Sequence, residues 1–369
     1  MKEGWEYKKL GDFCRKGKNI KWDDQTNDTS FRYIDLTSVD RNDLCIHNPQ
    51  IITKDNAPSR AKQIIQAGDI IFATTRPTLR RVSLIDEQYD GDICSTGFCV
   101  LRPNKEVKSK IIFYALLNDS FYKYIEPLQT GANYPAVTDS IVKNYIIPVP
   151  PLSEQQSIVD YLDSAFAKID AMKANAEKAL NEAKALFQAS LKEMLEPKEG
   201  WEEKTIEHFA RIVHGKNQKE VLDSNGSYPI YGSGGNIMGY ANEYLCEAGT
   251  TILGRKGTID NPLFIDERFW NVDTAFGIIA KDNCNKKYLY YSIKKVDWAK
   301  LNTGTTLPSL TQNVVYNVAM CAPPLSEQQS IVETLDSLKS KVDRLQENYD
   351  KISQECDALK QTILRQVFE

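Results

Sequence analysis

Three arginines set among threonines are the residues with the clearest chemical potential. They lie in ATTRPTLRR, residues 73–81, directly after the strand-like run GDIIFATT. An arginine can bind a phosphate or read a guanine through two hydrogen bonds, and a threonine can bond to a phosphate or touch a thymine methyl group. The segment therefore predicts a loop that contacts DNA. A charged, solvated loop with no ligand is the competing interpretation.

Other loops carry similar residue types, and most of them occur twice. CRKGKNIK at 14–21 resembles VHGKNQK at 213–219, TGANYP at 130–135 matches TGTTLP at 303–308, and Arg255–Lys256 follows the second strand-like run, TTILG. Recurrence at matching places favours a shared role. Together with the glycine-rich turn YGSGGN, the candidate DNA-binding residues are Lys16, Lys18, Thr74, Thr75, Arg76, Thr78, Arg80, Arg81, Asn133, Tyr134, Lys216, Asn217, Lys219, Ser233, Asn236, Arg255, Lys256, Thr305 and Thr306.

Motifs for catalysis are absent from the sequence. An amino-methyltransferase needs a glycine-rich cofactor loop and an N-P-P-Y-like tetrapeptide, but NPQI and NPLF lack the second proline. GTTILGRK has Gly257 where a P-loop needs serine or threonine, and the three histidines do not fall at metal or triad spacing. The eight cysteines form no C-x-x-C pair, so we expect reduced, mostly buried thiols. We therefore predict no catalytic residue and no metal site.

Length and composition point to two domains. The chain has 369 residues, of which 41% are hydrophobic and 26% charged. No run of about 18 apolar residues predicts a transmembrane helix, and the start MKEGWEYKKLGDF lacks an apolar signal-peptide core, so we expect a cytoplasmic protein without membrane contact. The net charge is only −4, so DNA binding would depend on local basic patches.

An internal repeat organises the whole chain. PPLSEQQSIVDYLDS at 150–164 recurs as PPLSEQQSIVETLDS at 323–337 with thirteen of fifteen residues identical, and KEGWEYKKLGDF at 2–13 recurs as KEGWEEKTIEHF at 198–209. The order is globular segment, shared segment, globular segment, shared segment. Two copies are too few for a solenoid, so we predict a pseudo-twofold arrangement.

Each PPLSEQQ opens a long predicted helix. Ser153 with Gln156, and Ser326 with Gln329, have the spacing of a capping box. Apolar residues then alternate at spacings of four and three, which is the pattern of a coiled-coil seam. The predicted seams are Ile158, Leu162, Ala165, Ile169, Met172, Ala176, Ala179, Ala183 and Leu186 in the first helix, and Ile331, Leu335, Leu338, Val342, Leu345, Tyr349, Ile352, Cys356, Leu359 and Ile363 in the second. Because the small middle residues of the first seam match large ones of the second, we expect antiparallel pairing within the chain.

The predicted fold class is α+β. Two mixed α/β domains, at 1–149 and 198–322, are separated by helices at 150–197 and 323–369 that pair as an antiparallel coiled coil. Strand-like runs at 68–75 and 250–254, and aromatic-rich helical stretches at 111–125 and 287–296, support the mixed composition.

This order of segments, with PPLSEQQSIV opening both helices and GW starting both globular segments, resembles the specificity subunit of type I restriction-modification systems. The resemblance covers essentially the whole chain. It implies that each globular domain is a target recognition domain that reads one half of a bipartite double-stranded DNA site, and that the paired helices set the spacer. It also implies a subunit without catalytic residues or a cofactor of its own.

The resemblance further implies partners that dock on the helices. Two modification subunits would carry S-adenosylmethionine, and restriction subunits would add ATP- and Mg-dependent translocation and cleavage. The candidate partner-binding residues, at the helix starts, are Glu154, Gln155, Gln156, Glu327, Gln328 and Gln329. Two other classes stay open: a freestanding DNA methyltransferase, and a coiled-coil scaffold that binds no DNA.

Overall fold

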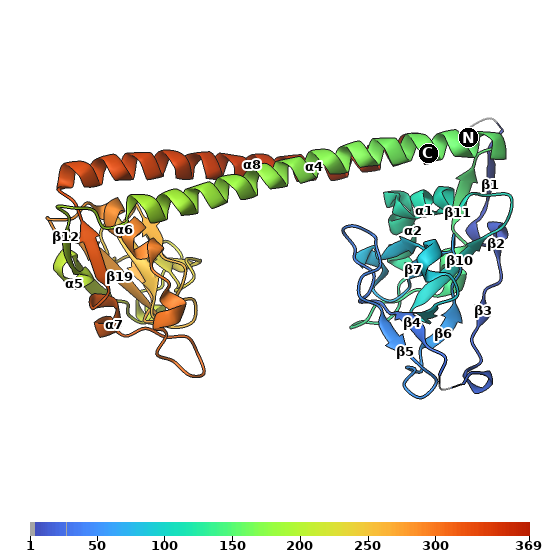
Figure 1. Cartoon of the computed structure of the whole chain (residues 1–369), viewed down its shortest axis with the longest axis horizontal. Coiled ribbons are helices and arrows are strands. Elements are labelled where there is room, and N and C mark those ends of the chain that lie inside the picture. The colour runs from blue at the N-terminus through green and yellow to red at the C-terminus, as the bar shows by residue number, and fades with distance from the viewer. Residues whose placement is uncertain (1–3, 27) are drawn as a thin grey trace. The chain divides into compact units, whose positions relative to one another are not determined.

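The computed structural model describes residues 4–26 and 28–369 and divides into two compact units. Unit 1 is built from 1–175 and 350–369, and unit 2 from 176–349. Each unit holds one globular domain and about half of each long helix, α4 (Leu152–Met194) and α8 (Leu325–Phe368) (Figure 1). The first two residues of the repeat that starts at Lys2 lie outside the described residues.

Domain 1, in unit 1, contains three small sheets. In one, β1 (Glu6–Lys9) pairs with β11 (Ile146–Val149), the strand that leads into α4. The second has the order β2 (Cys14–Arg15), β10 (Phe98–Pro103), β7 (Ile70–Ala73), β8 (Val82–Leu84). The third has the order β3 (Lys18–Asn19), β6 (Ala61–Ile64), β9 (Ile93–Ser95), β4 (Phe31–Ile34), β5 (Gln50–Ile52). The helices are α1 (Ser109–Leu117), α2 (Asp119–Ile125) and α3 (Asp139–Lys143).

Domain 2, in unit 2, repeats this plan with fewer strands. β12 (Glu202–Thr205) pairs with β20 (Ala319–Ala322). The second sheet has the order β13 (Ala210–His214), β19 (Ala275–Ala280), β16 (Thr250–Gly254), β17 (Leu263–Ile265). The third has the order β15 (Ile237–Ala241), β14 (Tyr228–Tyr231), β18 (Trp270–Asn271). The helices are α5 (Ile206–Phe209), α6 (Lys286–Lys295) and α7 (Gln312–Tyr316).

The predicted strands at 68–75 and 250–254 are β7 and β16, each central in its four-stranded sheet. Both are fully buried, which explains their uninterrupted apolar sequences. The helix predicted over 111–125 is wrong as a single element, because Asn118 is extended and separates α1 from α2. Its side chain accepts a hydrogen bond from Ser120 N and caps α2. A second helix therefore begins within the apolar stretch that was predicted as one helix.

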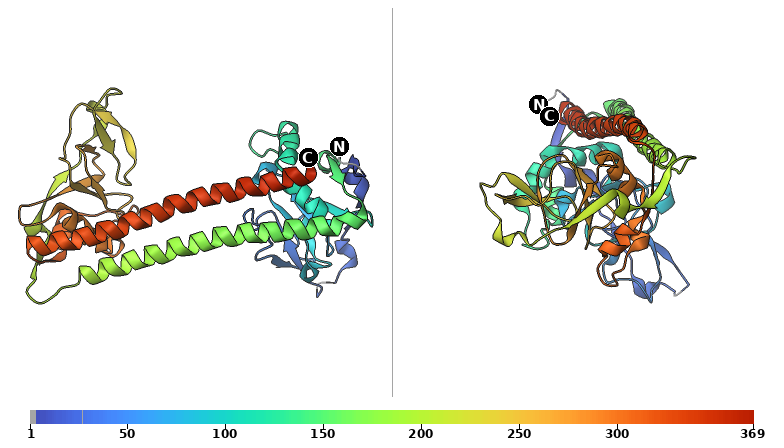
Figure 2. Two further views of the ribbon diagram at one scale, coloured as in Figure 1. Left: turned by 90° about the horizontal axis from the view of Figure 1, so that it is seen from above. Right: turned by 90° about the vertical axis from the view of Figure 1, so that its left-hand side faces the viewer.

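The two long helices run antiparallel. In unit 1, Asp170 of α4 bonds to Lys360 of α8, and three residues farther along α4, Lys173 pairs with Asp357. In unit 2, Lys184 Nζ donates to Gln346 Oε1 at 2.8 Å. Figures 1 and 2 both show α4 and α8 side by side, which confirms the predicted antiparallel pairing.

The cores of the domains extend into both helices. In unit 1, α1 and α2 lie between the helix pair and the sheet that contains β7 (Figure 1), and the core includes Leu162 of α4 and Leu364 of α8, both fully buried. In unit 2 the core includes Leu191 of α4 and Leu335 of α8. Each domain is therefore packed on its part of the helix pair through apolar contacts.

The seam predicted for the first helix is wrong at three positions of its second half, whereas Ala176 and Ala183 are half-buried as predicted. Met172 and Leu186 are each 58% exposed and Ala179 is exposed, whereas Leu180 and Phe187 are buried. After Ile169 the inward positions are Lys173, Ala176, Leu180, Ala183 and Phe187, which step by four and three in turn, whereas the predicted seam steps by three and four. The second predicted seam is confirmed except at Leu359, which is 46% exposed.

The predicted capping boxes are also wrong. Both helices begin two residues earlier than a serine cap would allow, at Leu152 and Leu325. The carbonyl of Pro151 accepts from Glu154 N and Gln155 N, so Ser153 already lies in the first turn. The glutamine expected in the box, Gln156, bonds forward to Asp160 instead.

Candidate nucleic-acid interface

The loop between β7 and β8 is short, and two of its residues have backbone angles in the left-handed region. Arg76 has φ 50° and Arg80 has φ 56°, on either side of a short 3-10 turn, Pro77–Leu79. This conformation is unfavourable for residues with a Cβ. Thr74 is buried and donates its hydroxyl to Gly97 O, so it terminates the strand and, contrary to the prediction, presents no surface to DNA. Thr75 is half-buried and Thr78 exposed.

The structure joins this loop to the predicted TGANYP segment. Arg76 N donates to Pro135 O at 2.7 Å, and Val137 N donates to Thr74 O at 2.9 Å. The guanidinium of Arg76 lies over the ring of Tyr134, 4.7 Å from its centroid. Tyr134 is 68% exposed, and Asn133 beside it is exposed too. Two segments that the sequence offered separately thus form one exposed surface.

The three arginines of the loop are not equivalent. Arg80 pairs with Asp119 Oδ1 at 2.7 Å and lies over the ring of Tyr122 at 4.2 Å, so its charge is neutralised and its position fixed. Arg81 is half-buried, and its Nε is buried without a hydrogen-bond partner among the described residues. Arg76 contacts an uncharged ring and is exposed. Sequence alone could not predict this difference, because Asp119 and Tyr122 lie on α2, far from the loop along the chain.

Domain 2 builds the corresponding surface with different side chains. Leu310 N donates to Arg255 O, as Val137 N does to Thr74 O, and Gly257 N donates to Pro308 O, as Arg76 N does to Pro135 O. Gly257, with φ +84°, therefore occupies the place of Arg76. Arg255 is half-buried and donates to Asp273 O at 3.3 Å. The exposed candidates beside this turn are Lys256, Thr305 and Thr306.

The glycine-rich segment YGSGGN is the hairpin turn between β14 and β15. Gly232 N donates to Asn236 O at 3.0 Å. Ser233 Oγ lies next to Gly257, so the hairpin and the turn of domain 2 adjoin. The edge strand β15 also exposes a group of apolar side chains that sequence reasoning missed: Ile237, Met238 and Tyr240. The short run IMGYA does not distinguish an exposed edge strand from a buried one, so no sequence signal identified them.

The remaining basic candidates follow β2 and β13 in the chain, with Lys16 on the link after β2 and Lys18 at the start of β3. Lys16 and Lys18 are exposed, and within the described residues no hydrogen bond or ion pair links them to the Arg76 loop. Lys216 is exposed, with its backbone bonded to Asn271 and Trp270. Asn217 caps a short turn that includes Lys219.

Gln155 and Gln328, two of the predicted partner-binding residues, lie inside their own domains, with 0% and 1% exposure. Each bonds to the backbone of its domain, so neither side chain offers a surface to a partner, and that prediction is not supported for these two. Glu154, Gln156, Glu327 and Gln329 are exposed.

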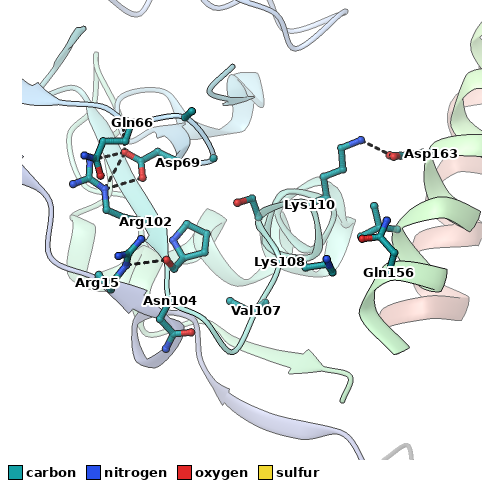
Figure 3. Close-up of a pocket in the computed structure, with 15 residues that line it drawn as sticks. Arg15, Gln66, Asp69, Arg102, Asn104, Val107, Lys108, Lys110, Gln156 and Asp163 are labelled. Atoms are coloured by element: carbon teal, nitrogen blue, oxygen red, sulfur yellow. Dashed lines mark hydrogen bonds and ion pairs between the residues drawn. The ribbon is translucent and has the colours of Figure 1, made fainter. Parts of the chain in front are cut away.

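A carboxylate fixes each domain to its helix. Asp163 of α4 bonds to Lys110 Nζ at 2.5 Å and Tyr114 OH at 2.6 Å. Asp336 of α8 makes the same two contacts, with Lys287 and Tyr291. In domain 1 this contact borders a polar cavity of about 500 Å³ between the domain and α4 (Figure 3).

The basic groups that line this cavity are mostly paired. Arg102 is buried and forms three hydrogen bonds with Asp69 and one with Ile64 O, while Lys110 points to Asp163 (Figure 3). Arg15 donates to Pro103 O. We therefore interpret the cavity as part of the contact between domain 1 and α4, and not as a ligand site.

The cysteines are mostly buried, as predicted, and none is disulfide-bonded within the described residues. Burial raises the pKa of the Cys14 thiol to about 11, and that of the Cys246 and Cys284 thiols to about 12. These thiols are protonated near neutral pH and are therefore poor nucleophiles. In residues 4–26 and 28–369, no group of three His, Cys, Asp or Glu could hold a metal, and no helix is long and apolar enough to cross a membrane.

The chain matches the family model described as Type I restriction modification DNA specificity domain twice, over residues 2–182 and 198–354. The type I restriction enzyme MjaVIII specificity subunit of Methanocaldococcus jannaschii is 25% identical over 396 residues, which cover 92% of this chain and 87% of that protein. The HindI specificity subunit of Haemophilus influenzae is 28% identical over 38% of this chain and 31% of that protein.

Two solved structures resemble the whole chain. One, described as showing complex assembly and conformational transition of the type I R-M system, has a TM-score of 0.86 at 26% identity and covers 99% of this chain and 97% of that one. The HsdS subunit from Thermoanaerobacter tengcongensis has a TM-score of 0.61 at 25% identity, over 100% of this chain and 97% of that one.

Proposed function

This chain belongs to the family of type I restriction-modification DNA specificity proteins, and on that premise we propose that it is the sequence-specific DNA-binding subunit of such a system. Domain 1 and domain 2 each read one half of a bipartite site in double-stranded DNA. The paired helices α4 and α8 set the spacer between the half-sites. The chain supplies recognition, and its partners supply the chemistry.

The observation that carries this proposal is that the two domains form equivalent loop surfaces. In each domain the loop after a central buried strand is joined by matching backbone hydrogen bonds to a second loop, TGANYP or TGTTLP. The framework is shared, whereas the exposed residues differ: Arg76 and Tyr134 in one domain, Lys256 and Thr305 in the other. A common framework with unlike readers is what recognition of two unlike half-sites requires.

We assign the DNA contacts to the accessible candidates of these surfaces. In domain 1 they are Thr75, Arg76, Thr78, Asn133 and Tyr134, with Lys16 on the link after β2 and Lys18 at the start of β3. In domain 2 they are Ser233, Asn236, Arg255, Lys256, Thr305 and Thr306, with Lys216, Asn217 and Lys219. Arg80 and Arg81 support the loop of domain 1.

Two modification subunits dock at the helix starts, beside Glu154 with Gln156 and Glu327 with Gln329. They carry S-adenosylmethionine, and restriction subunits bring the ATP- and Mg-dependent activities. The repeat supports two equivalent docking sites, because both helix starts carry the same exposed residues. The DNA substrate places the chain in the cytoplasm.

Methylation by the assembled complex tests this function. The chain is co-expressed with its modification subunit, and methylated adenines are mapped in the host genome. We expect one bipartite motif with a fixed gap. A freestanding methyltransferase would instead bind S-adenosylmethionine as the pure chain in calorimetry, and a scaffold would leave the partner's methylation independent of this chain.

A further inference from the structure

We propose that Arg76 reads a guanine in the half-site of domain 1, and that domain 2 reads its half-site without an arginine at the matching position, Gly257. The inference rests on the proposed DNA-binding function and names one residue and one base within it.

The equivalence of these two positions comes from the backbone. Arg76 N and Gly257 N each donate to the proline carbonyl of the adjoining loop, Pro135 or Pro308. Both residues have positive φ, 50° and +84°. The turn therefore demands a left-handed residue at this place in both domains.

Glycine is the residue that meets this demand without steric cost. Domain 2 has glycine there, so the turn itself does not need a side chain. Domain 1 keeps an arginine in a conformation that its Cβ opposes. A strained residue that the fold could replace by glycine is a candidate for a role of its side chain.

The side chain of Arg76 is arranged for recognition. Its guanidinium lies over the exposed ring of Tyr134, 4.7 Å from the centroid. Stacking of this kind orients the planar group and leaves the N–H groups at its edge available. A fixed fork of donors matches O6 and N7 of guanine, whereas a phosphate can be bound from many orientations.

The neighbouring arginine shows the contrast. Arg80 has the same backbone conformation, but Asp119 neutralises it. One terminal nitrogen of Arg80 is bound by Asp119, whereas no ion pair within the described residues engages Arg76. Of the two, the geometry selects Arg76.

The test compares variants in the complex with the modification subunit. Methylation is measured on a DNA library in which each position of the half-sites is randomised, and unfolding temperature is measured on the same proteins. The variants are Arg76→Gly, Arg76→Gln and Tyr134→Ala, with Tyr134→Phe as the conservative control. Arg60→Gln, an exposed arginine of the same domain, is the control for loss of charge.

We expect Arg76→Gly to lose discrimination at one G·C pair of the domain 1 half-site by about 10- to 100-fold, with the other half-site unchanged. Its unfolding temperature should stay the same or rise, because the strain is removed. Arg76→Gln should lose the same discrimination, Tyr134→Ala part of it, and Tyr134→Phe none.

Retention of the full motif by Arg76→Gly would overturn the inference. So would an equal loss of methylation on all sequences, matched by Arg60→Gln, because it would show that Arg76 acts only through its charge. If the wild-type complex methylates no bipartite motif, the proposed function fails, and that result is separate from the behaviour of the variants.

Discussion

Gln155 and Gln328 make the same three hydrogen bonds in the two domains. Lys108 N donates to Gln155 Oε1, and Gln155 Nε2 donates to Glu106 O and Pro150 O, at 2.7, 2.8 and 3.0 Å. Gln328 bonds in the same way to Asn285 N, Asn283 O and Pro323 O. The repeated PPLSEQQ segment therefore encodes an internal joint between each domain and the start of its helix.

We expect Gln155→Ala to destabilise unit 1 by about 2–4 kcal/mol, because it leaves buried backbone groups without partners. Gln156→Ala, one residue along and exposed, should change stability by less than about 0.5 kcal/mol. Urea unfolding, with hydrogen exchange to separate the units, measures both. Equal losses of stability in the two variants would show that Gln155 does not hold the domain to the start of its helix.

Stability at alkaline pH should depend on Tyr290. Burial, first, and the nearby Asp343 and Asp336 raise the pKa of Tyr290 to about 12. An unfolded tyrosine ionises near pH ~10, so from about pH 10 to 12 the unfolded state binds fewer protons and the free energy of unfolding falls. Tyr290→Phe should reduce the slope of the free energy of unfolding against pH by the equivalent of up to one bound proton. Tyr240→Phe, at an exposed position, should leave this slope unchanged. Identical slopes in both variants would refute the prediction.

The sequence predicted the elements better than their contacts. The spacing of apolar residues and the internal repeat were enough to predict the two long helices and the two central strands. They could not select every inward position of α4 beyond Ile169, because Ala179 with Leu180, and Leu186 with Phe187, are pairs of adjacent apolar residues. Only packing decides which member of each pair faces inward. The helix starts differ from prediction for a similar reason: the carbonyl of Pro151 accepts from Glu154 N and Gln155 N, so the helix begins before Ser153 and leaves it no capping role.

The sequence could predict which loops form the candidate DNA surface, but not which of their side chains are placed to contact bases. Arg76, Arg80 and Thr74 are close in sequence and similar in type. The structure places one over Tyr134, one against Asp119 and one inside the sheet. These differences depend on residues about 23 to 58 positions away in the chain, which local composition does not record.

The helix pair should set the gap between the half-sites. One heptad added to each helix, after Ala179 in α4 and before Ile352 in α8, keeps the apolar stripe in phase and lengthens the pair by roughly 10 Å, about three base pairs. Methylation mapping should show a correspondingly longer gap with unchanged half-sites. A heptad added to α4 alone should misalign the seam and lower stability. An unchanged gap with full activity would show that loops or partners set the distance.

Domain-specific substitution, read by adenine-methylation mapping, tests the central claim most directly. One variant replaces Arg76 and Tyr134 by alanine, and the other replaces Lys256, Thr305 and Thr306. We predict that the first relaxes recognition of one half-site by about 10-fold or more and leaves the other half-site intact, and that the second does the reverse. If either variant weakened both half-sites equally, the two domains would not be independent readers.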